Sequence, residues 1–244
     1  MCFTMSLVQE AHELEAEFAA LFAGLPLQFA YGTSGFTHPS WPVIPAEDPG
    51  RAHMLRWGLI PFWVKDRNQA EGLRKKTLNA RMETAWRLPS FRSAMPSRRC
   101  IAAVDGFYEP HRYEGRSYPF YICRRDRRPF GIGGLYDRWK DPVSGRTFAT
   151  FSVLTLPAEG ILARVHNEKL RMPALIPRHA YLRWLDRDLE AEAVFAVPRE
   201  FPLKELAAHP VGPQLYARSG RSEGEYLRKP HQYGIPAIDE LISP

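Results

Sequence analysis

The first residue with distinctive chemistry is Cys2, which directly follows Met1. Because cysteine has a small side chain, we expect Met1 to be removed, which would leave an α-amine and a thiol on one Cα. The amine can condense with an aldehyde, and the thiol then closes a five-membered thiazolidine ring. An α-amine has a pKa of about 7.7–8.0, so part of it is neutral near physiological pH. A cysteine at this position is usually accidental, so the pattern needs support from other residues.

Two polar residues interrupt the segment Leu78–Glu83 and are suited to binding an anionic ligand. The Asn79 amide offers both a donor and an acceptor, and Arg81 presents a planar set of donors that fits phosphate. In the alternative interpretation, Asn79 closes a turn and Arg81 pairs with Glu83 on the surface.

Two further residues have side chains suited to proton transfer. Glu109 ends an apolar strand beside aromatic residues and Pro110. Partial burial there would raise its pKa toward the range of a general acid–base, whereas a solvated strand edge would leave it unchanged. His166 is the residue type that best moves protons near neutral pH, although a lone histidine is often structural. No second histidine lies at metal-ligand spacing from it, so we expect neither a metal nor a cofactor.

Composition limits the classes of protein that the chain can represent. Its 244 residues carry 33 basic and 27 acidic side chains, and this net charge of +6 agrees with a polyanionic partner without requiring one. We find no apolar run long enough to cross a membrane and no secretory signal. Three cysteines are too few for a disulfide framework or a zinc site, which indicates a reducing, cytoplasmic location.

Hydrophobic periodicity and turn residues predict one α+β domain with a curved, mostly antiparallel sheet. The predicted strands are 54–60, 100–108, 118–123, 130–136 and 147–155, and the predicted helices are 6–25, 83–88, 158–164 and 178–185. Residues 32–50 and 65–76 are predicted to be loops because they are rich in glycine and proline or in polar residues. From about Pro198 onward the chain is predicted to be irregular.

The order of these segments resembles the SRAP family, whose name stands for SOS response-associated peptidase. The matching segments are Met1-Cys2, Arg56–Trp63, Asn79–Thr84, Ser90–Arg92, Arg98–Cys100, Asp105–Glu109, His166 and Arg171–Pro173. The ordered set is far more specific than any one member. The resemblance implies a single domain over residues 1–244, built around a barrel-like β-structure, with about the last 40 residues partly irregular. It also implies a groove for single-stranded DNA.

The resemblance further implies covalent capture of abasic sites in single-stranded DNA during the DNA damage response. Cys2 would form a thiazolidine with the ring-opened aldehyde of the lesion, and Glu109 would act as general acid–base. His166 would assist proton transfer at the Schiff-base stage and in reversal, and Asn79 would orient the amine or the sugar. The residues implied to contact DNA are Arg81, Trp57, Trp63, Arg92, Pro39 and Thr155. A buried structural role for Trp57 is equally compatible. The protein would act as a monomer, associated with the nucleoid when bound to DNA.

The sequence departs from the family pattern at four places. Phe3-Thr4 replaces the usual Gly-Arg, so a basic DNA contact at position 4 is missing, and Pro110 replaces the usual tryptophan. Residues 36–39 (Phe-Thr-His-Pro) stand where the family has Tyr-Asn-x-Ala-Pro. Four residues separate His166 from Arg171, whereas the family pattern His-x-Arg-x-Pro has one.

Two other functions remain open from the sequence. The first is a cysteine peptidase, with Cys2 as nucleophile and His166 as base, that acts on its own N-terminus. The second is a non-catalytic binder of single-stranded DNA that uses arginines and tryptophans.

Overall fold

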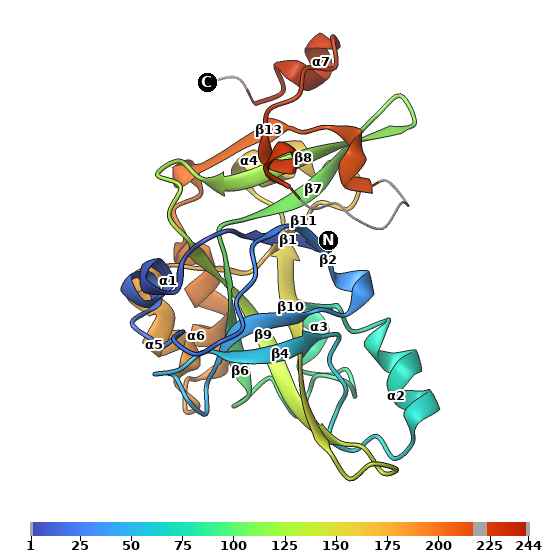
Figure 1. Cartoon of the computed structure of the whole chain (residues 1–244), viewed down its shortest axis with the longest axis vertical. Helices are drawn as coiled ribbons and strands as arrows, with labels where there is room; N and C mark the ends of the chain where they lie inside the picture. Colours follow the sequence, from blue (N-terminus) through green and yellow to red (C-terminus); the bar gives the residue numbers. More distant parts are fainter. Residues whose placement is uncertain (1, 217–223, 243–244) are drawn as a thin grey trace.

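A closed five-stranded β-barrel forms the lower part of the molecule in Figure 1. The computed structural model describes residues 2–216 and 224–242. The barrel strands are β3 (Ser40–Pro45), β4 (His53–Trp57), β6 (Arg99–Val104), β9 (Phe130–Lys140) and β10 (Thr147–Pro157). They pair in the order β10–β4–β3–β6–β9, and β9 pairs with β10 to close the ring. β10 and β4 run parallel, and the other four pairs are antiparallel. The predicted α+β fold with a mostly antiparallel, barrel-like β-structure is confirmed.

Three short strands extend the barrel. β5 (Asn79–Arg81) and β11 (Arg171–Pro173) both pair with the end of β10, β5 in parallel and β11 antiparallel. β12 (Leu175–Ile176) pairs with β9. Thr155 of β10 is opposite Arg81 on one side and Pro173 on the other. The end of β10 therefore brings together two segments that lie far apart in the sequence.

A second, five-stranded sheet lies above the barrel in Figure 1. Its strand order is β13 (Leu206–Pro210), β8 (Arg116–Arg124), β7 (Gly106–Tyr113), β1 (Thr4–Leu7) and β2 (Ala30–Ser34). β1 lies between β7 and β2 and is antiparallel to both, with Thr4 opposite Tyr108. The chain therefore starts beside the part of β7 that carries Glu109, and Figure 1 shows the N-terminus at the level where the two sheets meet.

Helices surround the two sheets. They are α1 (Ala11–Phe18), α2 (Arg67–Arg74), α3 (Met82–Ala85), α4 (Gly160–Val165), α5 (Tyr181–Leu185), α6 (Ala191–Ala196) and α7 (Pro236–Asp239). The described residues also form 3₁₀ turns: η1 (Gly35–Thr37), η2 (Arg178–Ala180), η3 (Val197–Glu200), η4 (Leu203–Glu205), η5 (Pro213–Tyr216) and η6 (Glu225–Arg228). Within residues 2–216 and 224–242, every helix is too short or too polar to cross a bilayer.

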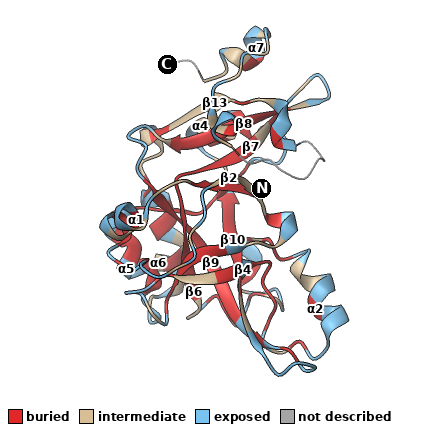
Figure 2. Ribbon diagram, in the orientation of Figure 1, coloured by how far each residue is buried: buried red, intermediate tan, exposed pale blue. Residues whose placement is uncertain are grey.

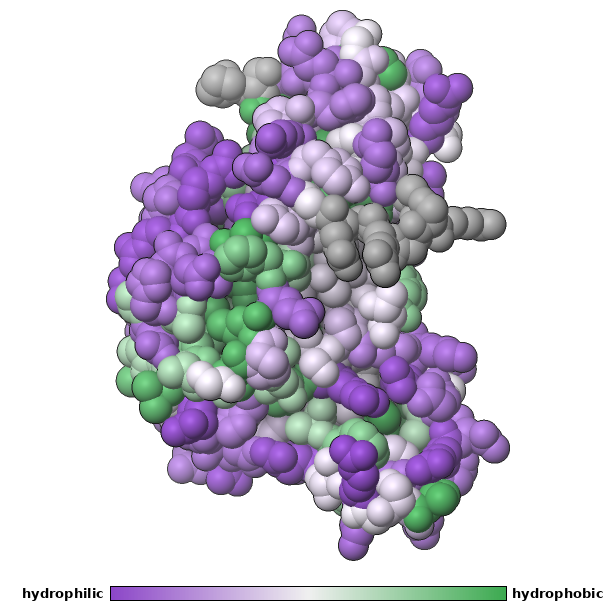
Figure 3. All heavy atoms as spheres, viewed as in Figure 1, coloured by the Kyte–Doolittle hydropathy of each residue, from purple (hydrophilic) through white to green (hydrophobic). Residues whose placement is uncertain are grey.

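The strands supply most of the hydrophobic core. Figure 2 shows both sheets largely buried and the outer turns of α1 and α2 exposed. One cluster of buried side chains contains residues of both sheets, including Met5, Phe107, Ile101 and Val153. The two sheets therefore share one core, as expected for layers that bury their apolar faces against each other. On the outside, Figure 3 shows a mostly hydrophilic surface on this face, with hydrophobic residues gathered near its middle.

The helix predicted over residues 6–25 is wrong at both ends. The Ser6 hydroxyl and the Val8 amide each donate to the Asp105 carboxylate at 2.7 Å, which holds this segment next to β7 as a strand. Ala19 adopts a left-handed conformation (φ 51°) and ends α1. Beyond it, the Glu15 carboxylate accepts from the Phe22 amide at 2.9 Å. The apolar spacing beyond Ala19 thus reflects burial of a turn rather than a continuous helix.

Both predicted loops contain regular structure. Residues 32–50 include part of β2 and all of β3. Two prolines fit into β3, because Pro42 has a register partner only on β4 and Pro45 only on β6. A proline is tolerated where the strand does not need its missing N–H. Residues 65–76 contain α2, which begins after Asp66, whose side chain accepts from the Gln69 amide at 2.8 Å.

The segment predicted as one strand over residues 100–108 is two strands, β6 and β7, separated at Asp105. Just after the break, Gly106 leaves room for the Tyr121 ring, since a Cβ at this position would lie 2.3 Å from it. The other predicted strands and helices are confirmed to within a few residues, and the segment after Pro198 supplies β13.

Asp105 is expected to be a main source of stability for the start of the chain. It is buried and accepts from Ser6, Val8 and the Arg228 guanidinium, the last at 3.2 Å. We expect Asp105→Ala to lower the free energy of unfolding by about 3–5 kcal/mol, because these donors lose a buried charged partner. Urea unfolding measures this loss. The control is Asp126→Ala, which removes a partly exposed pair with Arg124 and should cost less than about 1 kcal/mol. Equal losses for the two variants would contradict the assignment.

Candidate active site at the start of the chain

Cys2 is completely buried and lies two residues before β1. Its thiol donates weakly to the Thr4 carbonyl at 3.9 Å. Burial raises the pKa of the Cys2 thiol well above its usual value, and the nearby charge of Glu109 raises it further. The thiol is therefore protonated at neutral pH, and it lies close enough to Glu109 for the two groups to interact electrostatically.

Glu109 and His166 form a buried pair next to Cys2. The Glu109 Oε2 and His166 Nδ1 atoms are 3.5 Å apart, and the side chains are 1% and 3% exposed. Burial raises the pKa of Glu109 to about 7. Burial also lowers the pKa of His166. Near neutral pH the pair thus combines a carboxyl group that is partly protonated with an imidazole that is mostly neutral, which suits general acid–base chemistry.

The tautomer of His166 follows from its backbone partner. Nδ1 lies 2.7 Å from the Arg171 carbonyl oxygen, and because a carbonyl can only accept, Nδ1 must carry the proton. In the neutral imidazole, Nε2 then carries the basic lone pair. The side chain can therefore accept a proton at Nε2 without losing this contact.

Hydrogen bonds to the backbone hold His166 beside β7. The Asn167 amide donates to the Arg112 carbonyl at 2.8 Å and accepts from the Arg112 amide at 2.9 Å. His111 Nδ1 lies 3.1 Å from the carbonyl oxygens of Arg164 and Val165 at the end of α4. Together these contacts join the end of α4 to the strand that carries Glu109.

The four residues between His166 and Arg171 form a tight loop. The Leu170 amide donates to the His166 carbonyl at 3.1 Å, and Leu170 has a left-handed φ of 49°. The loop returns the chain so closely that Arg171 still contacts the His166 ring. The departure from the family spacing therefore leaves the pair of His166 and Arg171 intact.

Arg171 pairs with Glu83, which excludes the surface pair of Arg81 and Glu83 that the sequence left open. Its guanidinium donates to the Glu83 carboxylate at 2.6 and 2.9 Å and to the Thr155 carbonyl at 2.6 Å. Arg81 is exposed at the end of β5. Arg81 is thus available to an external anion, whereas Arg171 and the buried Thr155 connect β11, β10 and α3.

Asn79 has hydrogen-bonding capacity to offer a ligand. Its side-chain Oδ1 and Nδ2 are both buried, and neither has a hydrogen-bond partner among the described residues. Because unpaired buried polar atoms are costly, such an amide is commonly completed by a ligand or water. Asn79 begins β5, opposite Val153 of β10, and so lies on the same strand assembly as Arg171.

Trp57 connects the start of the chain to the Asn79 segment. Its indole is fully buried and donates to the Leu78 carbonyl at 2.8 Å. A Cβ at Gly35 would lie 3.0 Å from the Trp57 ring, and the Gly35 amide donates to the Phe3 carbonyl at 2.8 Å. Since no face of the indole is exposed, Trp57 positions these segments, in agreement with the structural alternative for this residue.

The remaining residues implied to contact DNA differ in exposure. Arg92 is exposed, and Pro39 is half-buried at the end of the η1 segment. Trp63 packs against Ile60 and Val64 in a cluster separate from the core that contains Cys2. Cys2, Glu109 and His166 therefore come together, and Asn79 and Arg81 share β5, next to Thr155 and Trp57.

Three residues near the pair were missed from the sequence. His111 and Asn167 act through backbone atoms, and Tyr216 ends η5 far downstream in the sequence. Partial burial raises the pKa of Tyr216, and the charges of Glu109 and Cys2 raise it further, so its phenol lies within electrostatic range of both. These contacts depend on tertiary structure, and no local sequence pattern indicated them.

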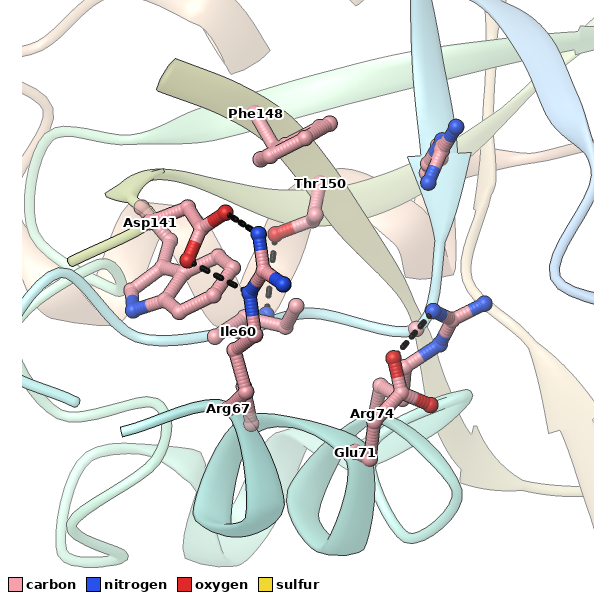
Figure 4. A pocket seen from close by; sticks show the side chains of 11 residues that line it. Ile60, Arg67, Glu71, Arg74, Asp141, Phe148 and Thr150 are labelled. Carbon is pink, nitrogen blue, oxygen red and sulfur yellow. Dashed lines mark hydrogen bonds and ion pairs between the residues drawn. The ribbon is translucent and has the colours of Figure 1, made fainter. Parts of the chain in front are cut away.

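A cavity of about 260 Å³ lies between α2 and the barrel (Figure 4). Figure 4 shows Arg67 paired with Asp141 and Arg74 paired with Glu71 around it. Two of its cations are thus neutralised within the protein, and Cys2, Glu109 and His166 do not line it. Among the described residues, no group of three or more candidate ligands is arranged to hold a metal ion.

Comparison with known proteins agrees with this architecture. The family model described as SOS response associated peptidase (SRAP) matches residues 1–217. The abasic site processing protein YoqW of Bacillus subtilis is 33% identical over 162 residues, which cover 62% of this chain and 69% of the relative. The abasic site processing protein HMCES of Gallus gallus is 27% identical over 202 residues, which cover 75% of this chain and 58% of the relative.

Two crystal structures share the fold over most of their length. A protein from Bacteroides thetaiotaomicron superposes with a TM-score of 0.86 and 27% identity, covering 95% of this chain and all of that one. A protein from Bordetella bronchiseptica gives a TM-score of 0.74 and 29% identity, covering 86% of this chain and all of that one.

Replacement of Glu109 should change how stability depends on pH. Folding raises the pKa of Glu109 from 4.5 to about 7, so the unfolded state ionises first as the pH rises and stability falls between these values. We expect Glu109→Gln to gain stability relative to wild type by on the order of 3 kcal/mol between pH 4.5 and pH 8. Urea unfolding of both proteins at several pH values measures this gain. A stability difference that is the same at every pH would contradict the raised pKa.

Replacement of Asn167 should loosen His166. Asn167→Ala removes two hydrogen bonds to the Arg112 backbone, and we expect a loss of about 1–3 kcal/mol in unfolding free energy. The pKa of His166, followed by NMR, should rise because the ring becomes better solvated. Glu168→Ala is the control: it removes a surface pair with Arg112 and a charge that raises the pKa of His166, so this pKa should move down in the control and not up. An unchanged His166 pKa in Asn167→Ala would show that these bonds do not position the ring.

Proposed function

The chain belongs to the SRAP family, and from this premise we propose that it captures abasic sites in single-stranded DNA as a thiazolidine on Cys2. The observation that carries the proposal is the buried pair of Glu109 and His166 next to the Cys2 thiol. The relatives named abasic site processing proteins support the choice of an aldehyde-bearing lesion as the substrate. The capture would shield the lesion during the DNA damage response.

The proposed reaction begins with opening of the sugar. An abasic site is a cyclic hemiacetal, and Glu109 would take the proton of its hydroxyl and return a proton to the ring oxygen, which yields the open aldehyde. The free α-amine of Cys2, exposed by removal of Met1, then attacks the aldehyde carbon. Glu109 protonates the departing hydroxyl, so that water leaves and an imine forms. A carboxyl group with a pKa of about 7 can serve in both directions near neutral pH.

Ring closure uses the thiol. The Cys2 sulfur adds to the imine carbon, its proton passes to His166 Nε2, and His166 returns this proton to the imine nitrogen, which becomes the ring amine. Overall, one aldehyde and one aminothiol give one thiazolidine and one water, with no change in oxidation state. Because Nδ1 of His166 already donates to the Arg171 carbonyl, Nε2 is the atom that can accept the proton. The same groups in reverse would release the lesion.

The neighbouring strand would bind the DNA. Asn79, whose amide atoms lack partners in the described structure, would hydrogen-bond the amine or the sugar. The exposed Arg81 and Arg92 would contact phosphates, and Pro39 and Trp63 would contact the DNA strand farther along. Trp57 and Thr155 would act indirectly by fixing these segments.

Cys2→Ala should abolish the stable linkage. With Met1 confirmed absent by intact mass, the wild type should give a heat-stable adduct with an abasic single-stranded oligonucleotide. Cys2→Ala should give only a Schiff base that requires borohydride to trap it, because the amine remains and the thiol is lost. Denaturing electrophoresis separates the two products.

The matched control is Cys100→Ala, which removes another fully buried thiol and should leave the adduct unchanged. A processed wild type that forms no heat-stable adduct would refute covalent capture. A Cys2→Ser variant that protects abasic DNA as well as the wild type would favour a non-catalytic binder.

A further inference from the structure

An exposed aromatic ring lies beside the reactive residue. The Phe36 side chain is 62% exposed, and its ring centroid is 4.8 Å from that of Phe3 at an interplanar angle of 32°. Phe3 directly follows Cys2 and packs partly against the core. The Phe36 ring thus packs against Phe3, the residue that follows the proposed nucleophile, and much of the Phe36 ring remains open to solvent.

Local hydrogen bonds hold Phe36 in this position. The Ser34 hydroxyl accepts from the Phe36 amide at 3.3 Å, and the Thr37 hydroxyl donates to the Ser34 carbonyl at 2.8 Å. The Gly35 amide donates to the Phe3 carbonyl, which fixes the η1 turn to the start of the chain. The turn is closed by His38, whose amide donates to the Gly35 carbonyl at 2.9 Å. Stacking on a ring that is already positioned costs little conformational entropy.

We propose that Phe36, supported by Phe3, is a stacking subsite for an unpaired nucleobase adjacent to the captured lesion. The inference rests on the proposed function, because it assumes that the DNA strand passes Cys2. Bases of single-stranded DNA stack on exposed aromatic side chains, and every base offers such a face. Purines present the larger face and should be bound more tightly.

The surroundings favour a base over the other common partners. Thr4 is buried, so the residues next to Cys2 offer no cation for a phosphate group. A single exposed ring beside one partly buried ring is far smaller than the patch that a protein partner requires. The position of the ring next to a nucleophile that acts on a base-free nucleotide agrees with a neighbouring base as its occupant.

The test uses oligonucleotides that carry the unreactive abasic analogue tetrahydrofuran, so that binding is measured without covalent capture. In one oligonucleotide, purines flank the analogue. In the other, further tetrahydrofuran residues replace those purines, so no base can stack. Phe36→Ala should weaken binding of the first about 5- to 100-fold and leave binding of the second unchanged. Phe36→Tyr keeps an aromatic ring and should bind both like the wild type.

Phe29→Ala is the matched control, since Phe29 is also an exposed phenylalanine and should affect neither oligonucleotide. A Phe36→Ala variant that binds the purine-flanked DNA like the wild type, or that weakens both DNAs equally, would overturn the subsite. Thermal melting shows whether the variant remains folded, and Phe36→Leu, which keeps an apolar side chain without a ring, should resemble Phe36→Ala.

A parallel reaction with a true abasic site separates this inference from the proposed function. If wild type binds the tetrahydrofuran DNA in a Phe36-dependent manner yet forms no adduct, covalent capture fails and the stacking subsite stands. If the adduct forms at the same rate in Phe36→Ala and wild type at limiting purine-flanked DNA, the subsite fails and covalent capture stands.

Discussion

The structure of the candidate site depends on the exclusion of water from the Glu109 carboxyl group. A carboxylate taken out of water raises its own pKa, and here the pKa reaches about 7. The His166 imidazole at 3.5 Å supplies a partner that is itself mostly neutral because it is buried. These pKa values depend on the contacts around β7 and around the end of α4, because those contacts keep solvent away from both side chains.

Each segment around the pair serves this exclusion with a different interaction. β1 is held against β7 by the Asp105 carboxylate, and α4 is held there by the His111 and Asn167 side chains. Arg171 has two roles, because its carbonyl fixes the His166 tautomer while its guanidinium joins Glu83 to Thr155. Removal of any one of these contacts would admit water or displace a ring, so the site is sensitive to residues that contact no substrate.

The sequence was sufficient for the fold class, and it named three residues that the structure brings together, Cys2, Glu109 and His166. Strand-length apolar runs such as 130–136 and 147–155 predicted the sheets, and ordered motifs around Cys2, Glu109 and His166 predicted the site. It failed where tertiary contacts decide the local structure. The apolar spacing of residues 6–25 favours a helix, yet Asp105, which is distant in sequence, makes residues 4–7 a strand. Asn167 bonds to backbone atoms, and such partners have no sequence signature. The capping residue Asp66 was the one overlooked local signal, since it predicts α2.

The central position of β1 has a consequence for biosynthesis. β1 lies between β2 and β7, and β7 leaves the ribosome only after more than a hundred residues have been translated. Until then the nascent chain cannot complete this sheet, so its first residues stay open to the enzymes that trim initiator methionine. Once β7 has emerged and the sheet closes, the same residues become buried. For the proposed chemistry, removal of Met1 would therefore have to precede closure of the sheet, and a fusion partner joined ahead of Cys2 would prevent it.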